Sequence, residues 1–159
     1  MGGGGSGSGQ EHLPVVDLDL VEHAESEYRA IFQTGSAEEV EAARFRLIWA
    51  LVHSAQHRHQ ARGQELCRTA LAALKPPGDR EYRYLAAVAA YKMGHYIEAR
   101  RELAKLLQEQ PGFRQAEFLR GLTEDAIVRE GLLGVGVVGL GAAVAGVALA
   151  LLLGGGGRK

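Results

Sequence analysis

Apolar residues recur at intervals of three and four between positions 10 and 130, and no segment combines strict alternation with β-branched residues. Intervals of three and four place apolar side chains on one face of an α-helix, whereas a strand needs a period of two. Turn-forming residues interrupt this pattern five times. We therefore expect an all-α domain of six amphipathic helices, at about 20–34, 37–54, 59–74, 80–93, 96–109 and 113–130.

The predicted helix ends carry signals of their own. Asp19 and Ser36 each precede a glutamate by three positions, which is the spacing of a capping box, and Asp79 is a third candidate for an N-cap. Pro76-Pro77 cannot continue the third helix, and Gly94 is suited to the left-handed turn that ends a helix. These signals give the six helices short connections.

Internal repetition decides between a simple bundle and a stack of helix pairs. Residues 91–99 read YKMGHYIEA and are followed by Leu103, Leu106 and Pro111, which reproduces the tetratricopeptide signature. A weaker copy lies one repeat earlier, with Gly63 at the position where an alanine is expected. We expect two repeat-like helix pairs, with the first and sixth helices as caps over their exposed ends.

Glycine content and charge divide the chain into four parts. Residues 1–16 begin with a glycine- and serine-rich leader and continue as an arm, and residues 17–130 form the helical domain. Residues 131–153 contain only Gly, Leu, Val and Ala, which predicts a membrane-spanning helix about 34 Å long. Residues 154–159 form a short tail that ends in Arg158 and Lys159. This order predicts a C-terminal tail anchor, with the domain in the cytosol and the basic tail as a targeting signal.

Two short motifs in the terminal parts have simpler interpretations. Met1-Gly2 with Ser6 fits a loose myristoylation pattern, but any glycine- and serine-rich leader would fit it as well. The spelling G-x-G-x-x-G from Gly134 to Gly139 lacks the preceding strand and the following acidic residue of a dinucleotide site. We expect a flexible leader and no cofactor.

Charge and residue chemistry exclude several classes of function. The formal net charge of −1 does not favour a nucleic-acid partner, and a single cysteine, Cys67, cannot form an internal disulfide. We expect Cys67 and Trp49 in the core of the weaker repeat. His53, His57 and His59 are the only cluster that resembles a metal site, but the segment has no acidic residue, and a solvated turn between repeats explains it better. No nucleophile, base and orienting group occur together, so we expect neither a metal site nor an enzyme.

The order of parts resembles the mitochondrial fission 1 protein family, which has a tetratricopeptide-like six-helix domain on a C-terminal tail anchor. The stretches most similar to the family are 45–54 (FRLIWALVHS), 84–99 (YLAAVAAYKMGHYIEA) and 130–139 (EGLLGVGVVG). The resemblance implies a location in the outer mitochondrial membrane and in peroxisomal membranes. It also implies a role in organelle fission, through recruitment of a dynamin-related GTPase or its adaptors.

A partner-binding groove is expected on the concave side, which the first helix of each pair lines in such repeats. The candidate residues are Leu47, Leu51, Ser54, Tyr84, Ala87, Val88 and Tyr91. The apolar members could equally belong to the core between helices, whereas Tyr84 and Tyr91 share one face and suit a half-wet surface. The apolar segment of the arm, Leu13 to Val16, could lie in this groove and compete with a partner.

Two other interpretations stay open. A tetratricopeptide co-chaperone or import receptor would hold acidic peptide tails with lysine and arginine on the concave face. The expected positions here are mostly apolar, Lys92 aside, which counts against that class. Self-association of the chain is not decided by the sequence.

Overall fold

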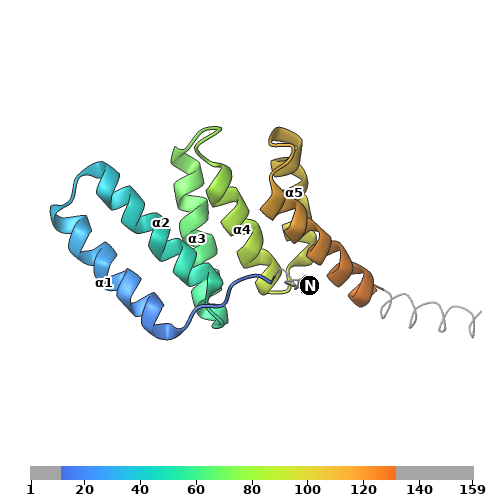
Figure 1. Ribbon diagram of the computed structural model, residues 1–159, viewed down its shortest axis with the longest axis horizontal. Helices are drawn as coiled ribbons and strands as arrows, with labels where there is room; N and C mark the ends of the chain where they lie inside the picture. Colours follow the sequence, from blue (N-terminus) through green and yellow to red (C-terminus); the bar gives the residue numbers. More distant parts are fainter. Residues whose placement is uncertain (1–11, 132–159) are drawn as a thin grey trace, which may run out of the picture.

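The computed structural model describes residues 12–131, and every regular element in this range is helical. Five helices are followed by a sixth over residues 114–131 (Figure 1). The first five are α1 (Leu18–Thr34), α2 (Ala37–His53), α3 (His57–Ala73), α4 (Arg80–Lys92) and α5 (Tyr96–Glu109). The predicted all-α, six-helix domain is therefore confirmed.

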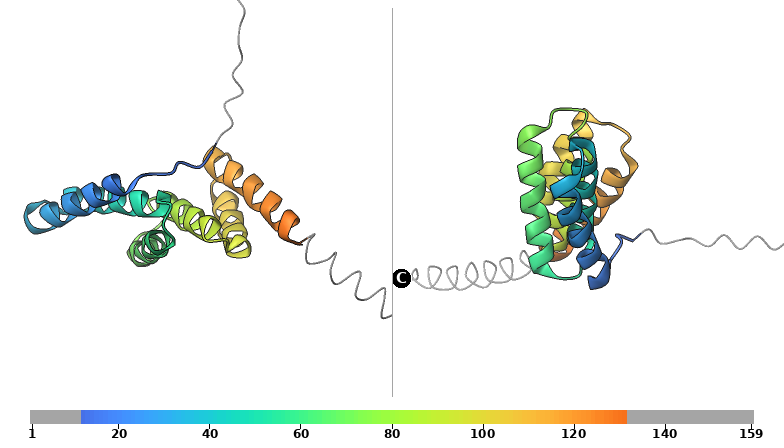
Figure 2. Two further views of the ribbon diagram at one scale, coloured as in Figure 1. Left: turned by 90° about the horizontal axis from the view of Figure 1, so that it is seen from below. Right: turned by 90° about the vertical axis from the view of Figure 1, so that its left-hand side faces the viewer.

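Consecutive helices pack as neighbours, and α2 also packs against α4. This arrangement stacks α2–α3 and α4–α5 as two antiparallel pairs, with α1 at one end and the helix 114–131 at the other (Figure 1). Viewed from below, α3 and α5 lie on one side of the stack, and the chain that precedes α1 lies on the opposite side (Figure 2). The stack therefore has two distinct faces, and α2 and α4 lie on the face that carries this chain.

The N-terminal ends of the helices show which of the predicted capping residues form a capping hydrogen bond. Ser36 and Glu39 form the predicted capping box at the start of α2. Asp17, not Asp19, caps α1, since its carboxylate accepts a hydrogen bond from the Leu20 amide at 3.0 Å. Asp79 occupies the N-cap position of α4 but makes no capping hydrogen bond. Its carboxylate pairs instead with Arg83 at 2.7 Å.

Small residues let the helices of each pair approach closely. Gly63 on α3 faces α2, and a Cβ atom at this position would lie 2.7 Å from Val52 Cγ2. Ala99 on α5 is fully buried. Gly94 adopts φ 79°, the left-handed conformation that ends α4, and the following His95 amide donates to the Ala90 carbonyl at 2.8 Å. The turn and the close approaches predicted from the repeat pattern are confirmed.

Two hydrophobic clusters form the core. The larger joins α2, α3, α4, α5 and the helix 114–131, and includes Ile48, Leu85, Leu103 and Leu119. The smaller fixes α1 on α2 and consists of Val21, Ala24, Leu47, Ala50 and Leu51. The first helix therefore caps the repeats through a core of its own.

Within residues 12–131, no helix is both long enough and apolar enough to cross a membrane. The predicted span at 131–153 lies outside the described residues, apart from Gly131. The same holds for the leader up to residue 11 and for the tail with Arg158 and Lys159.

Candidate functional site

The segment before α1, residues 12–17, lies across the face formed by α2, α4 and the helix 114–131 (Figures 1 and 2). We call this face the arm face. The Val16 amide donates a hydrogen bond to the His53 carbonyl at the end of α2, at 3.0 Å. Lys92 Nζ donates to the Pro14 carbonyl at 2.9 Å and to the His53 carbonyl at 3.1 Å. One lysine on α4 thus links the arm to the end of α2.

Most of the residues expected to line a groove are instead part of the core. Leu47 and Leu51 pack against α1, and Ala87 and Val88 lie in the large cluster. Five of the seven candidate groove residues are at most 2 % exposed, namely Leu47, Leu51, Ser54, Ala87 and Val88. Ser54 lies directly under the arm, where its backbone forms an isolated parallel β-bridge with that of Val16. A partner on the arm face cannot reach these side chains directly, because neighbouring helices and the arm cover them.

Tyr84 and Tyr91 are half-buried on α4. The ring of Tyr84 lies 5.4 Å from that of Phe113, and the ring of Tyr91 lies 5.5 Å from that of Tyr96. Burial raises the pKa of both phenols, so both stay protonated at neutral pH. Tyr84 also lines a hollow with Leu13 of the arm. Their exposed edges are available at the surface, but each ring also stabilises the packing around α4.

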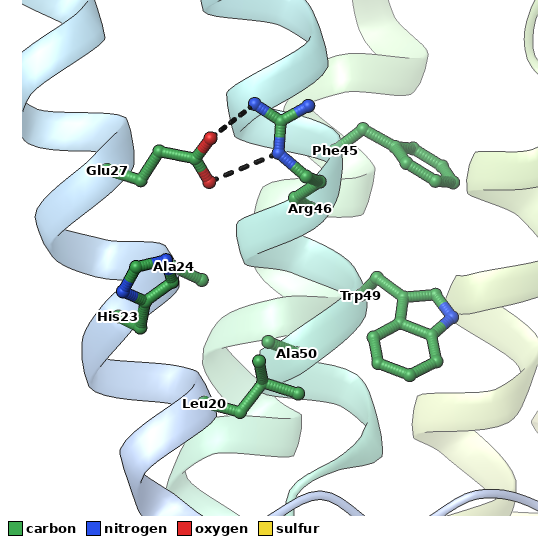
Figure 3. Close-up of a pocket in the computed structure, with 8 residues that line it drawn as sticks. All are labelled: Leu20, His23, Ala24, Glu27, Phe45, Arg46, Trp49 and Ala50. Atoms are coloured by element: carbon green, nitrogen blue, oxygen red, sulfur yellow. Dashed lines mark hydrogen bonds and ion pairs between the residues drawn. The ribbon is translucent and has the colours of Figure 1, made fainter.

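The arm face has an open pocket of about 320 Å³ between α1 and α2 (Figure 3). Its floor is mainly apolar, and an ion pair closes one end, where Arg46 binds Glu27 through two hydrogen bonds of 2.7 and 3.1 Å. The pocket is lined by Leu20, His23, Ala24, Glu27, Phe45, Arg46, Trp49 and Ala50.

A second, wider hollow of about 590 Å³ adjoins this pocket on the α4 side of α2. Phe45 and Arg46 line both hollows, which therefore adjoin along α2, and we call the two hollows together the α2 groove. The Phe45 ring packs edge-on against Tyr82, with 5.3 Å between ring centroids. The second part is lined by Glu38, Glu41, Ala42, Phe45, Arg46, Leu74, Gly78, Glu81 and Tyr82.

The Tyr82 hydroxyl fixes one wall of the groove by donating to Glu41, which also pairs with Arg44. Burial, followed by this contact with Glu41, raises the pKa of the Tyr82 phenol. The phenol therefore stays a neutral hydrogen-bond donor at physiological pH. The hydrogen bond links α2 to α4 and holds the aromatic wall in place.

The sequence pattern alone did not select Phe45 or Trp49 as half-exposed residues. A signal for them existed. On α2, Ala42, Phe45 and Trp49 follow a spacing of three and four and form a stripe beside the core stripe of Leu47 and Leu51. Neighbouring helices cover this second apolar stripe only in part.

The histidines do not converge on a site. The prediction of a solvated turn is wrong for His53, which is buried, stacks on Trp49 at 4.4 Å and donates through Nδ1 to the Trp49 carbonyl. Burial is the main reason that its pKa is lowered. His59 Nδ1 lies 2.9 Å from Ser54 Oγ, while His57 is exposed at the start of α3. Among residues 12–131, no group of three His, Cys, Asp or Glu side chains could hold a metal ion.

Cys67 is fully buried in the core, and burial raises the pKa of its thiol to about 12. A thiol of this kind is not a nucleophile at neutral pH. Its role in the described domain is that of a small apolar side chain.

Stacked helix pairs of this kind define the class, a tetratricopeptide-like helical domain. The model of the Fis1 C-terminal tetratricopeptide repeat matches residues 80–132. Mitochondrial fission 1 protein A of Arabidopsis thaliana is 34 % identical over 131 residues, which cover 82 % of this chain and 77 % of the relative. The protein of the same family from Mycosarcoma maydis is 39 % identical over 110 residues, covering 69 % and 72 %.

Solved structures show the same fold. Yeast Fis1, crystallised with an Mdv1 fragment, superposes with a TM-score of 0.63 at 21 % identity, covering 75 % of this chain and 91 % of that chain. Fis1 from Saccharomyces cerevisiae, in a second crystal structure, gives a TM-score of 0.62, also at 21 % identity, with coverage of 76 % and 91 %. The chain belongs to the mitochondrial fission 1 protein family.

Proposed function

We propose that this chain is a tail-anchored adaptor of the outer mitochondrial membrane, and also of peroxisomal membranes, that promotes fission without catalysing a reaction itself. In this proposal residues 131–153 cross the membrane and the helical domain lies in the cytosol. The arm face binds a fission adaptor or a dynamin-related GTPase. Two findings on relatives support this role. The similar sequences are named for mitochondrial fission, and yeast Fis1 was crystallised in complex with an Mdv1 fragment.

The observation that carries this proposal is the open α2 groove. Its floor combines the half-buried aromatic side chains of Phe45 and Trp49 with Leu20, which is 42 % exposed, and the buried Tyr82 packs beneath Phe45. Apolar side chains that line an open hollow are a candidate contact surface, and aromatic residues are common at the centre of interfaces. The groove lies on the same face as the arm.

The co-chaperone or import-receptor alternative is not favoured by the geometry. Such a domain would need lysines and arginines free to hold an acidic peptide tail. Lys92 is instead bound to the Pro14 and His53 carbonyls, and Arg46 is paired with Glu27. Two further arginines near the α2 groove are also paired, Arg44 with Glu41 and Arg80 with Glu81.

The test is binding of a purified fission adaptor, or of the dynamin-related GTPase, to the full chain in lipid vesicles, measured by co-sedimentation. Leu20→Ser removes an exposed apolar side chain from the groove, and Ile97→Ser removes a more exposed one, at 61 % against 42 %, from α5. We expect Leu20→Ser to weaken binding by about tenfold, because a residue at the centre of an interface contributes about 1–2 kcal/mol. Ile97→Ser is expected to bind like the unchanged chain.

Equal binding by all three chains would move the partner site away from the α2 groove. Binding of neither partner would contradict the proposed role itself. Analytical ultracentrifugation of the same full-length chains in detergent separates partner loss from a change in self-association.

A further inference from the structure

We draw no further inference here: the strongest candidate, the hollow between α1 and α3 that the exposed Phe32 lines together with Tyr28 and Arg62, is an unpartnered surface, and nothing in the part of the chain that the structure describes shows what covers it.

Discussion

Gly63→Ala tests whether α2 and α3 approach as closely as the repeat pattern implies. The new Cβ would lie 2.7 Å from Val52 Cγ2, 3.1 Å from the Val52 backbone nitrogen and 3.2 Å from Leu51 Cβ. Val52 and Leu51 are both fully buried, so neither can move aside without disturbing the core. Overpacking at such a site costs about 1–3 kcal/mol. Alanine is favoured over glycine in a helix by about 1 kcal/mol, which offsets part of this cost.

The net expectation for Gly63→Ala is a loss of up to about 2 kcal/mol in the free energy of unfolding. Gly121→Ala is the matched control, since it lies in the helix 114–131 and a Cβ there would have no neighbour within 4 Å. This change should raise the free energy of unfolding by about 1 kcal/mol, because it gains helix propensity alone.

Urea unfolding of the full chain in mild detergent, followed by Trp49 fluorescence, measures both changes and reports on the domain alone. With an m-value of about 2 kcal/mol/M, the Gly63→Ala midpoint should fall by up to about 1 M and the Gly121→Ala midpoint should rise. If Gly63→Ala is as stabilising as Gly121→Ala, the close approach of α2 and α3 is refuted.

Three further results are expected. Lys92→Met should speed amide hydrogen exchange at Val16 without unfolding the domain, because it removes the donor that holds the arm; unchanged exchange would show that the Val16 hydrogen bond suffices. Burial lowers the pKa of His53, so protonation of this side chain favours the unfolded state. The free energy of unfolding should therefore fall as the pH drops below 6.5, the ordinary pKa of histidine. In urea titrations, His53→Gln should show a weaker dependence of the free energy of unfolding on pH in this range. A chain lacking residues 131–159 should remain in the supernatant after ultracentrifugation with vesicles, with the circular dichroism of a folded helical domain; sedimentation with the vesicles would contradict the predicted anchor.

Sequence patterns predicted the features that depend on local chemistry. The Ser36–Glu39 capping box needs only two side chains three positions apart, and the Gly94 turn needs only a residue that tolerates φ 79°. The small residues Gly63 and Ala99 follow from the repeat period. Asp19 was the wrong cap because Asp17 has the same chemistry two positions earlier, and the apolar pattern does not fix the first turn to within two residues.

Which side chains are exposed at the site could not be predicted from sequence patterns. Whether Leu47 or Phe45 is exposed depends on which side of α2 the cap helix α1 covers, and this is decided by tertiary packing. The arm is held through backbone carbonyls of Pro14 and His53, which leave no trace in the side-chain pattern. Trp49 shows the effect of packing most clearly, since its ring borders the core as expected but also lines the open groove.

Site-specific photo-crosslinking on isolated mitochondria tests the central claim most directly. A photoreactive amino acid replaces Ala42, an exposed residue in the α2 groove, or Ala104, an exposed residue of α5 that is not among the groove residues. The full chain is then irradiated in the presence of the fission adaptor. The account predicts a covalent adduct from position 42 and none from position 104. An adduct from position 104 alone, or equal adducts from both, would contradict a partner site in the α2 groove.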